Sequence, residues 1–213
     1  MKTNLCYPIC IIVGLVLLLA GCMNPAEQFT TPTQDANSDV QEFTASWLFA
    51  PTLDDLIWDA DLIVEGTIAR IQETRLKHQI GTAPGMVYTD YQVDVAKILK
   101  SPPGFANRSV VIEHHGGTYQ GKTRIILEDE PYRVGEKVLL FLRDISMSPQ
   151  QTRPGEIRYS VMMPGGRFHI QPDGKLDTPT KNLAVADTYR GKDKSVLEKD
   201  ILTRLPTPFD YLQ

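Results

Sequence analysis

Residues 87–99 read Val87-Tyr88-Thr89-Asp90-Tyr91-Gln92-Val93-Asp94-Val95-Ala96-Lys97-Ile98-Leu99, and this stretch decides the fold. Apolar and aromatic side chains dominate the odd positions, whereas polar side chains such as Asp90, Gln92 and Asp94 occupy even ones. A period of two residues is typical of a long antiparallel strand with one buried face and one wet face. The residues that follow, Ser101-Pro102-Pro103-Gly104, favour a turn.

Further strands are predicted on both sides of this one. Upstream, residues 61–71 form an apolar stretch in which Gly66 indicates a bulge or bend. Downstream, the uninterrupted apolar run 138–142 is typical of a central strand that is covered on both faces. The remaining predicted strands are short: Val110–Ile112, Arg124–Leu127, Ile157–Val161, and Phe168–Ile170 paired with Lys175–Leu176 across the turn Pro172-Asp173-Gly174.

Two helices are predicted, one at each end of this strand-rich region. Thr52 is expected to cap a short helix that places Leu53, Leu56, Ile57 and Ala60 on one face. The sequence Ser195-Val196-Leu197-Glu198 resembles a capping box at the start of a C-terminal helix. Six or more short strands between terminal helices predict a small closed or nearly closed β-barrel.

The order of several motifs resembles a known family. These motifs are Ala60-Asp61-Leu62-Ile63-Val64-Glu65-Gly66, the long strand ending in Lys97-Ile98-Leu99-Lys100, the pair Gly116-Gly117, and Gly135-Glu136-Lys137-Val138-Leu139-Leu140-Phe141-Leu142. They are similar to a class of bacterial exported proteins and, more distantly, to the netrin-like module and the tissue inhibitors of metalloproteinases. The resemblance implies a mainly β fold, a small OB-like barrel that is closed or partly open, with short flanking helices. It implies no functional residue here, because those inhibitors use an N-terminal disulfide-bonded cysteine that this chain lacks.

The N-terminus carries an export signal. Lys2 precedes an apolar stretch that ends in Leu19-Ala20-Gly21-Cys22, which matches a bacterial lipobox. We therefore expect residues 1–21 to be a lipoprotein signal peptide and Cys22 to be acylated. Residues 22–46 are polar and should form a flexible, disordered tether, followed by one domain over residues 47–213. The alternatives are an ordinary signal peptide or an N-terminal anchor helix.

The predicted location and partners follow from the anchor and the charge. Two or more acyl chains hold a protein firmly on a membrane, so the chain is expected on the cell membrane or outer membrane, facing the periplasm or exterior. The 213 residues carry 22 Lys and Arg against 26 Asp and Glu, which makes nucleic acid an unsuitable partner. Cys6 and Cys10 would leave with the signal peptide, so no thiol chemistry is expected in the mature chain.

Glu113-His114-His115 is the strongest candidate for chemistry, with His169 or His78 as a possible third metal ligand. On a strand, however, His114 and His115 point to opposite faces, so the alternative is a strand end packed near Gly116-Gly117. Glu128-Asp129-Glu130 could gather calcium, but a solvated acidic loop is favoured. No metal site, no catalytic residue and no cofactor is therefore predicted, because nucleotide-binding and serine-hydrolase motifs are absent as well.

Three functions remain open at this point. The leading hypothesis is a non-enzymatic, lipid-anchored binding module for an envelope protein or glycan. The alternatives are a metal-dependent hydrolase that uses His114 and His115, and a small-ligand carrier, which needs a pocket of about 300 Å³ or more. Aromatic side chains on or beside strands either form a ligand-binding face or fill the barrel and its rim; these are Tyr88, Tyr91, Tyr119, Tyr132 and Tyr159.

Overall fold

The structure is a computed structural model, and it describes residues 40–43, 51–77, 85–127, 129–146, 157–162, 165–179 and 183–205. All of these residues belong to one unit, which comprises residues 37–213. The predicted signal peptide, Cys22, most of the predicted tether, His78 and Glu128 lie outside the described residues. Within the described part of the chain, no helix combines the length and the apolar character that a membrane span requires.

Five strands pair in a closed ring. They follow each other around the ring as β2 (Leu62–Lys77), β3 (Met86–Lys100), β4 (Ser109–His115), β8 (Arg158–Val161) and β7 (Lys137–Asp144), which pairs again with β2. Strands β4 and β8 run parallel, and the other neighbours in the ring run antiparallel. This arrangement is a small OB-like barrel, so the predicted mainly β fold is confirmed.

The sheet continues beyond the ring at β7. Strand β9 (Arg167–Ile170) pairs with the first half of β7, while β8 pairs with its second half. Strand β10 (Leu176–Asp177) then pairs with β9, which confirms the predicted hairpin around residues 172–174.

The pairing of strand β2 with β3 is irregular at several positions, and Gly66 lies at one of them. The register between β2 and β3 shifts between Glu65 and Gly66. A Cβ atom on Gly66 would come within 2.6 Å of the Asp94 carbonyl oxygen and 2.7 Å of a Val93 methyl group. Only glycine permits this close approach of the two strands without displacement, so the predicted bulge is confirmed.

Strand β7 separates two apolar cores, as its continuous apolar sequence predicts. Val138, Leu140 and Leu142 belong to an interior core to which all five ring strands contribute. Leu139 and Phe141 face the other way, into a core shared with three helices. These helices are α1 (Leu53–Asp59), α2 (Ala184–Tyr189) and α3 (Lys194–Arg204). The barrel is therefore filled by side chains and covered by helices on the outer face of β7.

The helix starts were predicted with mixed success. Thr52 caps α1 in a capping box with Asp55, as expected. The predicted capping box at Ser195 is wrong, because α3 begins two residues earlier and Asp193 is its N-cap, accepting a hydrogen bond from the Ser195 N–H. Helix α2 was not predicted, and its N-cap Leu183 makes no side-chain cap hydrogen bond that could mark it in the sequence.

A second, three-stranded sheet lies beside the barrel. Strand β5 (Gly117–Tyr119) follows β4 after Gly116, whose φ of +107° turns the chain, and it pairs with β6 (Lys122–Ile126). Strand β1 (Val40–Phe43) adds to the other edge of β6 in parallel. Residues 40–43, which the sequence places in the tether, form this strand although they show no apolar periodicity.

Candidate functional site

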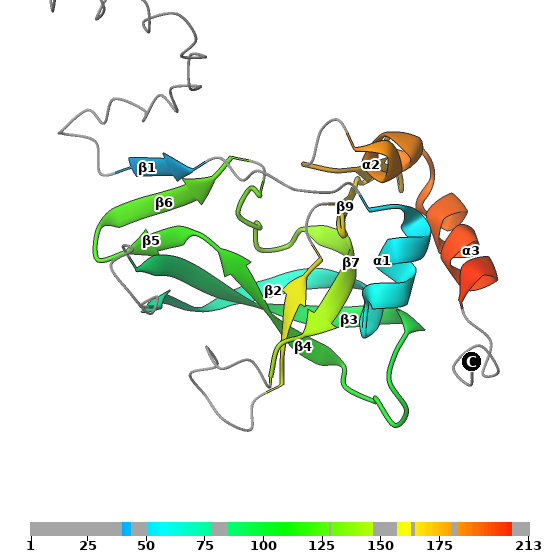
Figure 1. The fold of residues 1–213 in the computed structure, drawn as a ribbon, viewed down its shortest axis with the longest axis horizontal. Coiled ribbons are helices and arrows are strands. Elements are labelled where there is room, and N and C mark those ends of the chain that lie inside the picture. Colours follow the sequence, from blue (N-terminus) through cyan, green and yellow to red (C-terminus); the bar gives the residue numbers. More distant parts are fainter. Residues whose placement is uncertain are drawn as a thin grey trace, which may run out of the picture. The chain divides into compact units, whose positions relative to one another are not determined.

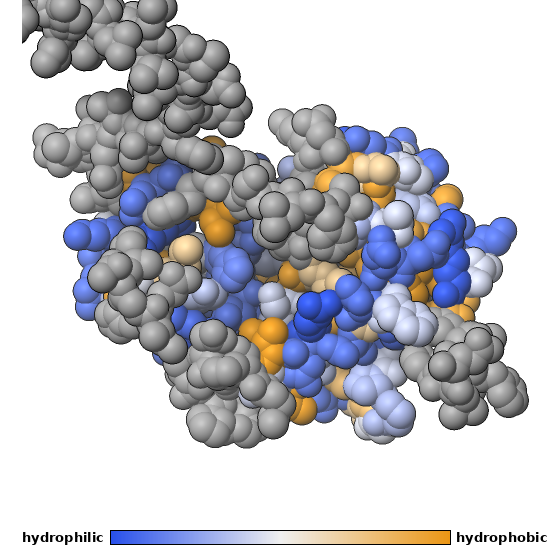
Figure 2. Space-filling view, viewed as in Figure 1, coloured by the Kyte–Doolittle hydropathy of each residue, from blue (hydrophilic) through white to orange (hydrophobic). Residues whose placement is uncertain are grey.

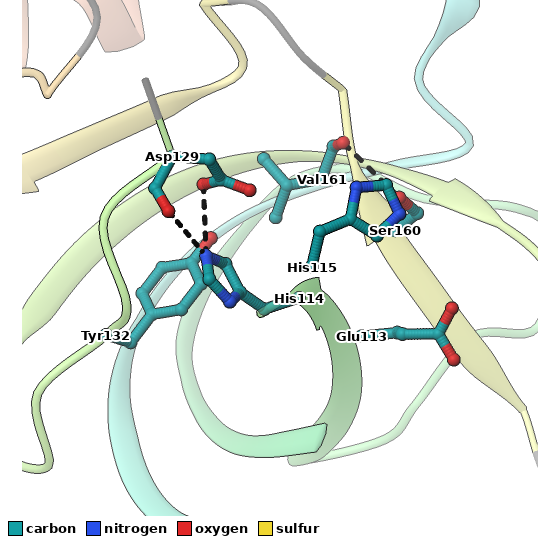
Figure 3. A pocket seen from close by; sticks show the side chains of 7 residues that line it. All are labelled: Glu113, His114, His115, Asp129, Tyr132, Ser160 and Val161. Atoms are coloured by element: carbon teal, nitrogen blue, oxygen red, sulfur yellow. Dashed lines mark hydrogen bonds and ion pairs between the residues drawn. The ribbon is translucent and has the colours of Figure 1, made fainter. Parts of the chain in front are cut away.

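A pocket of about 210 Å³ opens where strands β4 and β8 end (Figure 3). Three of its side chains come from the end of β4 and two from the neighbouring part of β8, and the segment before β7 supplies the rest. The residues that line it are Glu113, His114, His115, Asp129, Tyr132, Ser160 and Val161. Because consecutive strand residues alternate between faces, β4 presents His114 toward the barrel interior and Glu113 and His115 toward its outer face.

His114 forms the inner wall of the pocket and is held by Asp129. Its Nε2 atom lies 2.9 Å from the backbone carbonyl oxygen of Asp129 and 3.3 Å from the Asp129 carboxylate. A carbonyl oxygen only accepts hydrogen bonds, so the Nε2 atom of His114 carries a proton and donates it to this carbonyl. The His114 side chain is buried, and Nδ1 has no hydrogen-bond partner among the described residues.

Tyr132 lies beside His114 and is covered by a buried arginine. The two rings meet edge to face with their centroids 5.6 Å apart, and the Arg167 guanidinium lies 3.6 Å from the centroid of Tyr132. Burial raises the pKa of Tyr132, so its hydroxyl stays protonated at neutral pH. This hydroxyl has no hydrogen-bond partner among the described residues either, so two hydrogen-bonding groups at the inner wall remain unused.

Arg167 connects the inner wall to a second imidazole. Its Nη1 atom lies 3.6 Å from Asp129, and its Nη2 atom lies 3.7 Å from Glu136, which also pairs with His169. Burial opposes ionisation of Glu136, but the hydrogen bonds from His169 and from the Arg133 N–H, together with the nearby Arg167 charge, outweigh it and lower the pKa of Glu136. The carboxylates at this end of the barrel thus have cationic or hydrogen-bonding neighbours.

The outer wall of the pocket belongs to a buried group of charges, here termed the charged cluster. Asp90, which is fully buried, pairs with both Arg75 and Arg158, and Glu113 pairs with Arg75. The Lys77 Nζ atom lies 2.5 Å from the same Glu113 carboxylate. The cluster comes from four adjacent ring strands, and its members are Arg75, Lys77, Asp90, Glu113 and Arg158.

His115 and Ser160 lie at the mouth of the pocket. His115 is exposed and contacts Tyr88 edge to face, with the ring centroids 4.9 Å apart. The surrounding protein desolvates its ring and thereby lowers the pKa of His115, and the nearby positive charge of Lys77 lowers it further. His115 is therefore neutral at neutral pH and both donates and accepts hydrogen bonds at the mouth.

The structure tests several of the predicted site residues. His114 and His115 do point to opposite faces, as expected from their positions in a strand. His169 pairs with Glu136 instead of joining them, and no three His, Cys, Asp or Glu side chains in the described ranges gather as a metal site would require. The prediction of a solvated acidic loop is wrong for Asp129, which is buried because His114 and Arg167 approach its carboxylate.

The tyrosines mostly fill the barrel. Tyr91, Tyr132 and Tyr159 are buried in the interior core, which confirms for these three that the tyrosines fill the barrel. Tyr88 and Tyr119 are partly exposed. The charged cluster and Arg167, by contrast, were not anticipated, and only the presence of opposite charges at alternating positions of separate strands could have indicated them.

A larger hollow of about 480 Å³ lies along the turn between β9 and β10. Most of its lining side chains are exposed, including Asp173, Lys175 and Arg190. It lacks the buried polar groups of the pocket at β4 and β8, so the smaller pocket is the better candidate site. Neither the known protein-family models nor the curated proteins include a match to this chain.

Proposed function

We propose that this protein is a lipid-anchored component of a bacterial cell envelope whose OB-like barrel is a non-enzymatic binding module. The lipobox ending in Cys22 supports the anchor. The pocket at the ends of β4 and β8 is the proposed recognition site, with an envelope protein or glycan as its partner. The membrane is contacted through acylated Cys22, and the domain faces the periplasm or exterior.

One observation supports binding: the His114 and Glu113 side chains of the pocket are held in place by buried partners. The Nε2 atom of His114 is committed to Asp129, and the Glu113 carboxylate to Arg75 and Lys77. Groups that are fixed in this way present a rigid pattern of donors and acceptors, which favours recognition because little side-chain entropy is lost on binding.

The surface of the barrel fits a polar partner. On the face shown in Figure 2, hydrophobic residues occur in small separate groups among hydrophilic ones. The pocket itself combines two carboxylates, two imidazoles and a serine hydroxyl. Sugars and polar protein segments offer the hydroxyl and amide groups that such a set recognises.

The barrel is less suited to carrying an enclosed small ligand. Its interior is occupied by the apolar core, and the pocket of about 210 Å³ is smaller than the cavities of about 300 Å³ or more that usually enclose such ligands. A partner that inserts one residue or one sugar unit suits this volume better than a ligand that must be fully enclosed.

Metabolic labelling with a palmitate analogue tests the anchor. Labelling of the product, and its loss in Cys22→Ser, is expected. Equal labelling of both forms, or labelling of neither, would contradict the anchor without bearing on the pocket.

Cross-linking in native membranes tests the binding site. His115→Ala and Ser160→Ala should reduce recovery of the cross-linked partner about tenfold or more, because each removes a hydrogen-bonding group at the mouth. Lys175→Ala, in the hollow beside β9, is the matched control and should retain the partner. Unchanged recovery in both mouth variants, or equal loss in the control, would refute the proposed site.

A further inference from the structure

The edge of β6 holds a segment that precedes the barrel in the sequence. Strand β1 pairs with β6 in parallel over four residues, from Val40 opposite Thr123 to Phe43 opposite Ile126, and β5 occupies the other edge (Figure 1). If β1 departed, β6 would present an unpaired row of backbone N–H and C=O groups. Such an edge is a template for any other extended chain.

Two side chains of β1, those of Val40 and Glu42, are exposed. Neither apolar core of the described residues includes a residue of β6. The pairing extends over four residues, and each backbone hydrogen bond in it contributes little in exchange with water. Residues 44–52 connect β1 to α1, and so short a linker keeps β1 at a local concentration in the millimolar range.

The register shows that β1 is an imperfect match for this edge. Opposite residues of paired strands share one side of the sheet, so Gln41 lies beside Arg124 and Glu42 beside Ile125. A neutral amide thus lies beside a cation, and a carboxylate beside an aliphatic side chain. A segment with an acidic residue beside Arg124 and a β-branched residue beside Ile125 would pair better at both positions.

We propose that the β6 edge is a second binding site, which pairs in parallel with an extended peptide segment of a partner protein. Strand β1 occupies this site until the segment replaces it. This inference extends the proposed binding function, because it names the partner of the edge as a polypeptide. The favoured segment is acidic beside Arg124 and β-branched beside Ile125. Because β1 lies between Cys22 and the barrel, its replacement also frees residues 40–43 from β6.

A labelled peptide tests the site. Its sequence is that of residues 38–45 with the changes Q41E and E42V, and its binding to the full chain in detergent micelles is followed by fluorescence anisotropy. Gln41→Pro in the protein removes a backbone N–H from β1 and should tighten peptide binding at least about threefold. Glu42→Val in the protein improves the pairing of β1 and should weaken peptide binding by a similar factor. Circular dichroism checks that both variants keep the fold.

Two controls define the result. Arg124→Glu should remove the preference for the peptide with Q41E over the same peptide without it, while a peptide with proline in place of Gln41 should not bind. Equal affinity for wild type, Gln41→Pro and Glu42→Val would overturn the proposal, as would a dimer in sedimentation that exchanges β1 between two copies. These measurements use no native partner, so their failure leaves the test of the pocket mouth unaffected, and failure of that test leaves this one intact.

Discussion

Replacing Asp90 by Asn is the sharpest test of the charged cluster. The Asp90 side chain is fully buried, as is that of Arg158, and the side chain of Arg75 is 11% exposed. Asparagine keeps the size of aspartate but removes the negative charge that both guanidinium groups share. The two cations then remain in a poorly solvated place without that carboxylate, which is the costly situation for a buried ion pair.

The expected loss is large for a domain of this size. Breaking a buried pair on one side typically destabilises a protein by about 3–5 kcal/mol. For a domain of this length, such a loss lowers the midpoint of thermal unfolding by roughly 6–20 °C. Since a native domain is stable by only about 5–15 kcal/mol, Asp90→Asn should leave the fold marginal.

Urea unfolding, followed by tryptophan fluorescence, measures this loss against a matched control. Asp54→Asn removes the same charge from an exposed pair, because Asp54 and Arg204 are 69% and 45% exposed and lie 3.0 Å apart. That variant should lose less than about 1 kcal/mol. A loss of under 1 kcal/mol for Asp90→Asn, equal to the control, would refute the claim that the cluster is a buried, mutually dependent set of charges.

A second variant separates charge from shape. Replacing Arg75, Asp90 and Arg158 together by Met, Leu and Met removes the ions but keeps similar volumes, and Lys77 still pairs with Glu113. Most of the lost stability should return, because apolar side chains need no compensation when buried. A further loss in the triple variant would show that the geometry of the ion pairs, and not their charge balance, is required.

Three further predictions concern other parts of the fold. Gly66→Ala should lose about 1–3 kcal/mol in thermal unfolding, because its Cβ would lie 2.6 Å from the Asp94 carbonyl oxygen. The pKa of Glu136 is lowered from its usual value of 4.5, so the ionised carboxylate stabilises the fold above pH 4.5, and this contribution disappears as the pH falls through the lowered pKa. Glu136→Gln should therefore lose less stability to urea on acidification than the wild type does. An unchanged pH profile of stability would contradict this. Protein washed with metal-free buffer should carry no stoichiometric zinc by elemental analysis. Stoichiometric zinc that is lost in His114→Ala would instead support the metal-dependent hydrolase.

Much of the barrel could be predicted from local sequence patterns. The alternation in residues 87–99 predicted β3, and the unbroken apolar run predicted β7 between two cores, because burial on one or both faces dictates those patterns. The parallel pairing of β4 with β8 could not be predicted in this way, since it joins residues 111–113 to residues 158–160 and depends on the closure of the whole ring. Strand β1 was missed for a related reason, as an added edge strand needs only backbone groups.

The candidate site was predicted in part. The sequence indicated Glu113, His114 and His115, because imidazoles and carboxylates are the usual groups of binding and catalytic sites. It gave no indication of Arg75 and Asp90 as buried partners, because a charged residue at an alternate strand position is usually on the wet face. Their burial depends on opposite charges supplied by separate strands, and a pattern within one strand does not contain that information.

The pocket lies where the charged cluster on the outer face meets the His114–Asp129 pair on the inner face, because consecutive residues of β4 point to opposite faces. Glu113 belongs to the charged cluster on the outer face, whereas the adjacent His114 belongs to the inner group with Asp129. A ligand at the end of β4 therefore contacts two side chains whose positions are set by independent buried partners. Such rigidity helps recognition, since the donor and acceptor pattern exists before the ligand arrives.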